Sequence, residues 1–280
     1  GLARCALNPP TMQSKKYKLI PAKKTKCIAV IGGGIGGMEA AIVCAKRGHR
    51  VFLYEKSNRL GGVYRAAAAP SFKEKDRALI DWYIRELLQN GVTLRMKQTV
   101  EEVESMTSMY DEIIVATGSK ANRIPVPGAD KAIQAVDFLL GKEQVGENVT
   151  IIGGGLTGCE IAYELYLQGK TPIIVEMKDD LIAGAGICLA NSSYLRDFFN
   201  ANHVTVFLNT QLIQIQPHGV TVKNKNGEFH INADSVILSV GYHPNPQFPE
   251  SSRIHHVGDC SKVGNLRSVI WQAWDVAMKI

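Results

Sequence analysis

The stretch Val30-Ile31-Gly32-Gly33-Gly34-Ile35-Gly36-Gly37-Met38-Glu39 decides the fold of the chain. An apolar run, Cys27–Ile31, leads into its glycines, and an alanine-rich run, Ala40–Lys46, follows them. The sequence therefore predicts a strand, a glycine turn and a helix, the context in which a glycine pattern indicates dinucleotide binding. In such a turn one glycine permits the tight bend, one lets the backbone approach a pyrophosphate, and one lets the helix pack closely on the strand. These positions are, in order, Gly32, Gly34 and Gly37, and Gly36 is a further predicted contact.

An acidic residue completes this first unit. Glu55 follows the predicted strand Val51–Tyr54 and lies eighteen residues after Gly37. A carboxylate at this position binds ribose hydroxyls, while the pyrophosphate lies on the N–H groups and the positive end of the new helix. The loop after the strand ends in two glycines, which again indicate backbone close to a ligand. From this loop we predict contacts by Lys56, Arg59, Gly61 and Gly62.

The second half of the chain repeats the pattern. Val149–Glu176 reads as a strand, a glycine turn, a helix and a second strand that ends in glutamate. Five positions of matching chemistry lie at one offset of 121 residues: Gly32 and Gly153, Gly37 and Gly158, Glu39 and Glu160, Gly48 and Gly169, and Glu55 and Glu176. A shared offset at five positions predicts two dinucleotide-binding domains. The predicted ligand contacts of the second are Gly153, Gly155, Gly158, Glu160 and Glu176.

Two crossings divide the chain. Ala116-Thr117-Gly118 follows a buried strand and leads into the proline-rich stretch Ile124–Gly128. Gly241–Pro246 follows the strand Ser235–Val240 in the same way and is expected to return the chain to the first domain. The predicted fold class is α/β, with two Rossmann-like, three-layer domains, the first of them discontinuous. We expect residues 26–127 and 244–280 in the first domain, residues 128–243 in the second, and residues 1–25 as a linker.

The composition excludes several other classes. The 280 residues are 45% hydrophobic and 21% charged, as in an ordinary globular protein. The net charge of +6 comes from a lysine-rich connector, and without an aromatic-interleaved basic stripe we expect no nucleic-acid partner. No membrane segment is credible, and six scattered cysteines without a C-x-x-C pair suit a reducing cytoplasm. The connector lysines are Lys15, Lys16, Lys18, Lys23, Lys24 and Lys26.

Taken together, these motifs resemble the pyridine-nucleotide-disulfide oxidoreductase superfamily. The resemblance rests on both glycine turns, Leu60-Gly61-Gly62, Ala116-Thr117-Gly118 and Val257-Gly258-Asp259. It implies that the first turn binds the ADP half of FAD and the second binds NAD(P)H. It also implies that Asp259 binds the flavin ribityl chain. The final helix, expected to open near Ile270, would direct its positive end to the flavin pyrimidine edge. The resemblance thus adds Ala116, Thr117, Gly118, Gly258, Asp259 and Ile270 to the predicted cofactor contacts.

The sequence departs from the disulfide-reducing branch, because Val63–Ile80 contains no redox cysteine pair. Cys5-Ala6-Leu7-Asn8-Pro9-Pro10 and the lysine connector instead resemble a junction in NADH:flavin oxidoreductases related to old yellow enzyme. That group includes 2,4-dienoyl-CoA reductase, 2-enoate reductases and trimethylamine dehydrogenase. The resemblance implies a C-terminal fragment that follows an N-terminal FMN barrel. It makes Cys5 the last ligand of a four-iron four-sulfur cluster in the parent enzyme.

The expected activity is transfer of a hydride from NADH to FAD. In the parent enzyme, electrons would continue to the cluster and to FMN, and the final substrate would be reduced in the barrel. Hydride transfer needs no side-chain acid or base, so no catalytic residue is predicted. Glu176 favours NADH over NADPH because a carboxylate repels a 2′-phosphate, an effect that nearby Lys178 softens.

The alternative comes from trimethylamine dehydrogenase. There the corresponding site holds ADP, and the module is structural or regulatory. The glycines and Glu55 serve ADP as well as FAD, whereas Leu60-Gly61-Gly62 and Asp259 favour a complete flavin.

Overall fold

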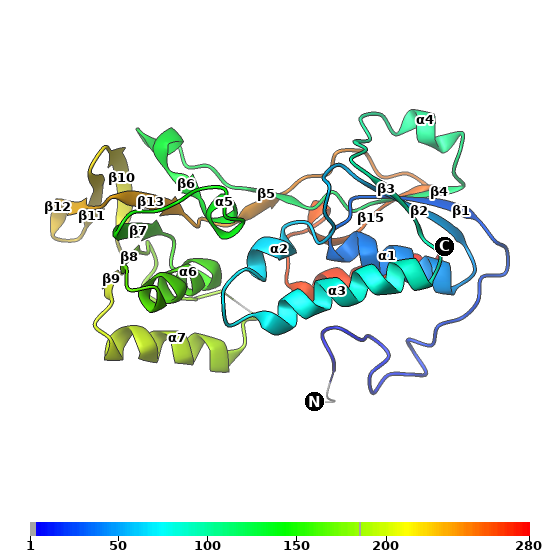
Figure 1. Ribbon diagram of the computed structural model, residues 1–280, viewed down its shortest axis with the longest axis horizontal. Helices are drawn as coiled ribbons and strands as arrows, with labels where there is room; N and C mark the ends of the chain where they lie inside the picture. Colours follow the sequence, from blue (N-terminus) through cyan, green and yellow to red (C-terminus); the bar gives the residue numbers. More distant parts are fainter. Residues whose placement is uncertain (1–3, 185) are drawn as a thin grey trace. The chain divides into compact units, whose positions relative to one another are not determined.

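The computed structural model describes residues 4–184 and 186–280, which divide between two units (Figure 1). Unit 1 contains the chain up to Arg65, Glu74–Lys120 and Tyr242–Ile280. Unit 2 contains Ala66–Lys73 and Ala121–Gly241. Each unit has its own parallel sheet and its own hydrophobic core.

The sheet of unit 1 has five parallel strands in the order β15-β4-β1-β2-β3. The central strands are nearly continuous runs of Ile, Val and Ala, as expected for a parallel sheet that is covered on both faces. The strands are β15 (Ile254–His256), β4 (Glu112–Val115), β1 (Cys27–Ile31), β2 (Arg50–Glu55) and β3 (Thr93–Met96).

Helices α1 (Ile35–Lys46), α3 (Glu74–Gln89) and α8 (Leu266–Ala277) lie together on one side of this sheet (Figure 1). Helix α1 contacts both of the others, and its residues from Ile35 to Cys44 are buried. Ala29 and Ile31 contribute to a separate cluster with Val103, Met106 and Phe248, beside the short helix α4 (Glu104–Thr107).

Unit 2 has three layers. Its parallel sheet has the strand order β6-β13-β7-β8-β9. One core packs it against helices, and a second core packs it against the antiparallel sheet β10-β11-β12. The helices are α5 (Ala135–Leu139), α6 (Leu156–Leu167) and α7 (Leu189–Ala201). The strands are β6 (Ile133–Gln134), β13 (Ser235–Leu238), β7 (Asn148–Ile152), β8 (Thr171–Val175), β9 (Thr205–Phe207), β10 (Gln211–Gln216), β11 (Gly219–Asn224) and β12 (Gly227–Asn232).

Short elements complete the chain. Strands β5 (Ser119–Ala121) and β14 (Tyr242–Pro244) pair as a two-stranded sheet where the chain passes from one unit to the other. The remaining elements are α2 (Tyr64–Ala67) and the 3₁₀ turns η1 (Ala129–Lys131) and η2 (Gly258–Cys260).

The predicted α/β class with two Rossmann-like sheets is confirmed. The chain passes between the two units at residues 120/121 and 241/242, whereas the proline-rich stretches predict these boundaries at 127/128 and 243/244. The chain already crosses in β5, ahead of the prolines. No motif or spacing in the sequence predicts that Ala66–Lys73 belongs to unit 2. Among the described residues, no helix combines the length and the apolar character that crossing a membrane requires.

The segment expected to be a linker packs on unit 1. From residue 4 to Lys26 it has no helix or strand, but consecutive turns shape it. Pro9 and Tyr17 are buried, and Tyr17 is only 6% exposed. The segment is therefore an ordered covering of unit 1 in the residues that the structure describes.

Candidate functional site

The glycine turn after β1 has the geometry that its sequence predicted. Gly32 has a φ of +110°, and a Cβ atom there would collide with the carbonyl oxygen of Ala116. A Cβ atom at Gly37 would collide with the carbonyl oxygen of Gly32, so the first turn of α1 packs directly on the turn that follows β1. Gly34 differs, because no heavy atom lies within 4 Å of the place where its Cβ would be. Its missing side chain leaves open space at the amino terminus of α1, as a pyrophosphate requires.

The turn after β7 has the same three roles. Gly153 has a φ of +106°, and a Cβ atom there would collide with the carbonyl oxygen of Ser239. A Cβ atom at Gly158 would collide with the carbonyl oxygen of Gly153. At Gly155 nothing lies within 4 Å of an added Cβ, so the amino terminus of α6 is open in the same way.

The carboxylate of Glu55 is fixed beside the first turn. It is 7% exposed. Its Oε2 accepts a hydrogen bond from the Gly33 N–H at 2.8 Å, and its Oε1 accepts one from the Ser57 N–H at 2.7 Å. Each carboxylate oxygen has capacity for a second hydrogen bond. Glu55 can therefore hold the turn and bind a ribose hydroxyl together.

Glu176 holds the second turn in the same manner, accepting from Gly154 N–H at 2.6 Å and from Lys178 N–H at 2.8 Å. The structure also extends the repeat. An added Cβ at Gly33 would meet Leu60, and one at Gly154 would meet Leu181. These leucines are again 121 residues apart, so the spacing in the sequence already contains this further pair of the repeat.

Further predicted glycines of unit 1 gather at the amino terminus of α1. Gly34 and Gly61 form an isolated parallel bridge, and a Cβ at Gly62 would lie 3.0 Å from the Cα of Gly34. A Cβ at Gly36 would lie 3.8 Å from the Cα of Gly258. Segments distant in sequence thus supply backbone without side chains at one place, which suits a long, close-fitting ligand.

The remaining predicted residues near β2 and β4 have other surroundings. Lys56 and Arg59 have exposed side chains in the loop after β2. The Thr117 hydroxyl donates to the carbonyl oxygen of Asn245 at 2.7 Å, and the Asn245 N–H donates to the carbonyl oxygen of Gly118 at 3.1 Å. These bonds join the two crossing segments within unit 1.

Asp259 lies in η2 with a half-buried carboxylate. Its Oδ1 accepts from the Gly264 N–H at 3.0 Å, and its Oδ2 accepts from the Ser119 hydroxyl at 3.3 Å. Burial raises the pKa of Asp259, and these two hydrogen bonds partly oppose it.

Helix α8 begins at Leu266, earlier than the expected opening near Ile270. Asn265 and Ser268 form a capping box that starts the helix, with the Ser268 N–H donating to Asn265 Oδ1 at 3.0 Å. The Ile270 side chain lies in the second turn and is fully buried. Any ligand contact at this helix would therefore come from its first turn.

The comparison with known families agrees with this geometry. Residues 26–261 match the family described as pyridine nucleotide-disulphide oxidoreductase. The chain belongs to this family. It is 38% identical over 282 residues to a cinnamate reductase from Clostridium sporogenes, covering 99% of this chain and 42% of the relative. It is 33% identical over 293 residues to an NADH oxidase from Thermoanaerobacter brockii, covering 99% and 44%.

A solved structure is also similar. A 2-naphthoyl-CoA reductase in complex with 2-naphthoyl-CoA superposes with a TM-score of 0.90 at 25% identity, covering 99% of this chain and 43% of that one. The chain thus spans less than half the length of the relatives that it matches.

In this member of the pyridine nucleotide-disulphide oxidoreductase family, Glu160 has a partner that the sequence did not predict. Lys73 Nζ lies 2.6 Å from Glu160 Oε2, and the two side chains are 17% and 10% exposed. Next to this ion pair, the Ser71 hydroxyl and N–H donate to Glu164 Oε2 at 2.8 and 3.0 Å. Glu160 thus holds Ala66–Lys73 on α6. Its expected place beside a nicotinamide stays a prediction.

Glu39, the repeat counterpart of Glu160, has a different partner. The Tyr83 hydroxyl donates to Glu39 Oε2 at 2.9 Å, and both side chains are buried. Burial raises the pKa of Glu39 to about 7, and the hydrogen bond from Tyr83 opposes this only in part. The two halves of the repeat have therefore kept the glutamate and changed what it binds.

The family name refers to disulphides, but all six cysteines of this chain are free. Burial raises the pKa of Cys44 and of Cys159 to about 12, so these thiols are inert. The described residues contain no group of three or more His, Cys, Asp or Glu suited to a metal ion. Because an iron–sulfur cluster requires several ligands, these residues do not form a site for one by themselves. The role of Cys5 as a ligand stays a prediction.

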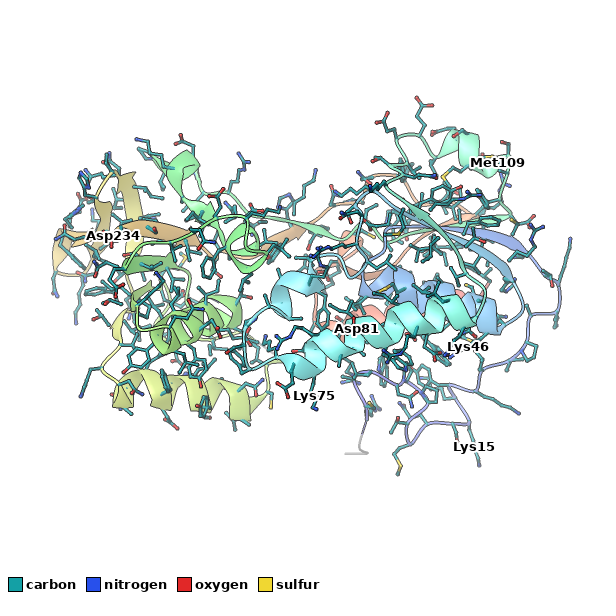
Figure 2. The ribbon with its side chains drawn as sticks, in the orientation of Figure 1. Lys15, Lys46, Lys75, Asp81, Met109 and Asp234 are labelled. Atoms are coloured by element: carbon teal, nitrogen blue, oxygen red, sulfur yellow. The ribbon has the colours of Figure 1, made fainter. Side chains whose placement is uncertain are left out.

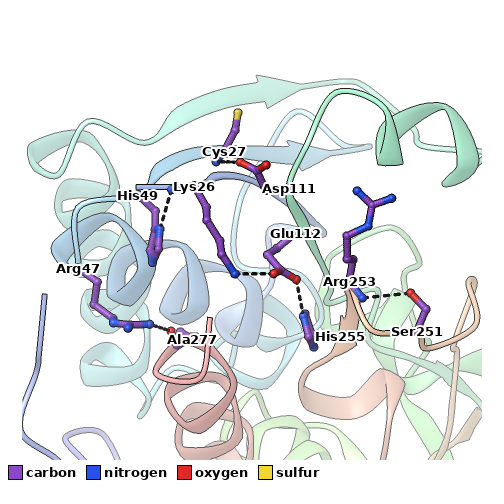
Figure 3. Close-up of polar contacts among 10 residues, drawn as sticks. All are labelled: Lys26, Cys27, Arg47, His49, Asp111, Glu112, Ser251, Arg253, His255 and Ala277. Carbon is purple, nitrogen blue, oxygen red and sulfur yellow. Dashed lines mark hydrogen bonds and ion pairs between the residues drawn. The ribbon is translucent and has the colours of Figure 1, made fainter. Parts of the chain in front are cut away.

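A polar network lies at the opposite end of the unit 1 sheet (Figure 3). Glu112 Oε1 lies 2.6 Å from Lys26 Nζ, and Glu112 Oε2 lies 2.9 Å from His255 Nε2. Glu112 thus joins the starts of β1 and β4 to β15. Burial raises the pKa of Glu112, but these two hydrogen bonds outweigh it and hold that pKa below its usual value. A cavity of about 250 Å³ borders the network. This network joins three strands at their amino-terminal end, whereas open α/β sheets bind ligands at the carboxyl ends of their strands.

Proposed function

We propose that unit 1 binds FAD, that unit 2 binds NADH, and that the chain transfers a hydride from NADH to FAD. The observation that carries this proposal is the duplicated turn. Both turns leave the place of one side chain empty at a helix amino terminus, at Gly34 and at Gly155. Both also hold a buried carboxylate beside that opening. Two such openings in one chain suit two dinucleotides.

FAD, in preference to ADP alone, is supported by what lies beyond the first turn. A site for ADP needs a ribose carboxylate and a pyrophosphate cradle, which Glu55 and Gly34 provide. Gly61, Gly62 and Gly258 add more bare backbone at the same helix terminus. Asp259 adds a half-buried carboxylate, and a polyhydroxylated ribityl chain is a suitable donor for it.

When both are bound, NADH supplies the hydride and the flavin ring of FAD accepts it. The chain's own residues bind and orient. Backbone N–H groups at the start of α1 and of α6 receive the pyrophosphates, and Glu55 and Glu176 receive the riboses. The capped first turn of α8 presents the positive end of a helix dipole, which favours a reduced, negatively charged flavin.

NADH is proposed over NADPH because of the charge at the end of β8. The Glu176 carboxylate is 8% exposed and already ordered by two backbone N–H groups. It accepts from a 2′-hydroxyl and repels a 2′-phosphate. Lys178 donates its backbone N–H to Glu176, and its side chain is exposed to solvent, which screens its charge.

The named activities of the relatives belong to longer proteins. Cinnamate reductase, NADH oxidase and 2-naphthoyl-CoA reductase are each more than twice the span of this chain. We therefore assign reduction of a final substrate, and the FMN and iron–sulfur cluster that the resemblance implies, to a longer parent enzyme. To the residues of this chain we assign only the first step, the transfer of a hydride from NADH to FAD.

The test is the colour of the purified chain. We expect yellow protein that retains FAD and is bleached by anaerobic NADH, and more slowly by NADPH at equal concentration. The Gly155→Ala variant is the control, because it places a methyl group only in the second opening. It should keep FAD and lose most of the bleaching. Colourless protein that carries tightly bound ADP would overturn the proposal in favour of a structural nucleotide site.

A further inference from the structure

The segment from residue 4 to Ala22, called the N-terminal segment below, is attached along α8 at two places. At the first, the Trp271 indole Nε1–H donates to the carbonyl oxygen of Cys5 at 3.2 Å. The ring of Tyr17 packs on the same indole, with the ring centroids 5.2 Å apart. Trp271 thus contacts both ends of the stretch from Cys5 to Tyr17.

The second attachment is Arg47, which follows α1. Its Nε donates to the carbonyl oxygen of Ile20 at 3.0 Å, and its backbone carbonyl accepts from the Ala22 N–H at 2.9 Å. Its guanidinium also donates to the carbonyl oxygen of Ala277, in the last turn of α8. Figure 3 shows this bond between Arg47 and Ala277. The N-terminal segment is therefore fixed beside the middle and beside the end of one helix.

The conformation of the segment fits such an attachment. Turns close between Asn8 and Thr11, between Pro10 and Gln13, and between Gln13 and Tyr17. The turns bury Pro9 and Tyr17 and leave the lysines in solvent. Lys15, labelled in Figure 2, extends away from the ribbon.

Trp271 is itself held in place from the helix. The guanidinium of Arg267 lies 4.4 Å from the centre of its ring, one turn earlier in α8. The preceding residue, Ile270, is fully buried, so consecutive residues of α8 serve the core and the N-terminal segment. The capping box at Asn265 fixes the start of the same helix.

We propose that Trp271 is a positioning residue that fixes Cys5 on the helix that serves the flavin. This inference rests on the proposed function, because α8 matters to Cys5 only if its first turn faces a flavin. A single helix then joins the flavin site to the N-terminal segment. Whatever Cys5 binds in the parent enzyme is held at a constant distance from that site.

The experiment measures the reactivity of the Cys5 thiol in the purified, FAD-loaded chain. A maleimide labels the cysteines, and mass spectrometry gives the rate at each one. Cys188 is exposed in unit 2 and serves as the internal reference, while the half-buried Cys27 reports any general opening of unit 1. Trypsin cleavage after Lys15, Lys16 and Lys18 is the second readout.

We expect Trp271→Ala to raise the labelling of Cys5 relative to Cys188 by about tenfold, since a hydrogen bond and a ring contact are lost together. Trp271→Phe keeps the ring contact and should raise it only about threefold. Labelling of Cys27 should not change. The matched control is Trp82→Phe, at a tryptophan of α3 that is 39% exposed and should leave all rates unchanged.

Tyr17→Ala removes the ring contact with Trp271 and leaves α8 unchanged, so it still tests the attachment of Cys5 if Trp271→Ala fails to fold. Unchanged labelling of Cys5 and unchanged trypsin cleavage in Tyr17→Ala and Trp271→Phe would overturn the inference. The proposed function fails by a different result, colourless protein that NADH does not bleach. Rapid labelling of Cys5 in the variants together with normal bleaching by NADH would support both.

Discussion

The buried carboxyl of Glu39 gives the sharpest test of the energetics of unit 1. It is 5% exposed, and the Tyr83 hydroxyl is its donor. The perturbation is Glu39→Gln, which keeps the size and the acceptor oxygen and removes the ionisation. Burial sets the pKa of Glu39 at about 7, against an ordinary value of 4.5.

The sign and the size of the effect follow from these two values. Below pH 4.5 the carboxyl is protonated in both the folded and the unfolded chain, and the full stability is present. As the pH rises toward 7 only the unfolded chain loses the proton, so the free energy of unfolding falls. Above pH 7 the free energy of unfolding has fallen by its full amount, about 3 kcal/mol. Glu39→Gln should remove this dependence, and its advantage over the parent chain should grow by about 3 kcal/mol between pH 4.5 and pH 8.

Urea unfolding at several pH values measures this directly. Trp82, Trp271 and Trp274 all belong to unit 1, so tryptophan fluorescence follows the unfolding of that unit alone. The control is Glu86→Gln, which removes the more exposed ion pair with Lys46 on the same two helices and should cost less than about 1 kcal/mol. Parallel stability curves for Glu39→Gln and the parent chain would refute the reasoning.

Three further outcomes are expected. Gly34→Ala should fold normally, because its Cβ meets open space, and should weaken FAD binding at least about tenfold by equilibrium dialysis. Gly37→Ala should lower the free energy of unfolding of unit 1, measured in urea, by about 2 kcal/mol, because its Cβ collides with backbone. Glu176→Gln should raise the Kd for NADH about tenfold and reduce the preference for NADH over NADPH, both measured by the concentration dependence of bleaching. The variant should retain its FAD. Lys73→Met should destabilise unit 2 by about 3 kcal/mol in thermal unfolding, because it removes the ammonium group that lies 2.6 Å from the shielded Glu160 carboxylate, and adding Glu160→Met should recover part of the loss.

The turns were predictable because their cause is local. Position 32 requires glycine because its φ is positive, and position 37 requires glycine because a Cβ atom there would collide with the Gly32 carbonyl oxygen, so sequence and structure agree at both positions. The apolar period of Leu79, Ile80, Tyr83 and Leu87 predicts a helix over residues 74–89, and α3 lies at Glu74–Gln89 with Ile80, Tyr83 and Leu87 on one buried face.

The contact that the sequence did not predict depends on tertiary pairing. Lys73 and Glu160 are 87 residues apart, and no period or motif relates them. The start of α8 is a different case, since Asn265 and Ser268 have the spacing of a capping box and carried a local signal. The expected opening near Ile270 came from the resemblance, which fixes a helix only approximately.

The exchange of Ala66–Lys73 has a consequence for dividing the gene. The chain passes between units at 65/66, 73/74, 120/121 and 241/242, so neither unit is encoded by one uninterrupted piece of DNA. A fragment that begins at Ala121 and ends at Gly241 would lack the strip that covers Glu160, Tyr163 and Glu164. Such a fragment needs that strip returned, either fused through a flexible tether or added as a synthetic octapeptide. The same requirement makes the pair a natural split reporter, in which assembly of the peptide and the fragment can be titrated.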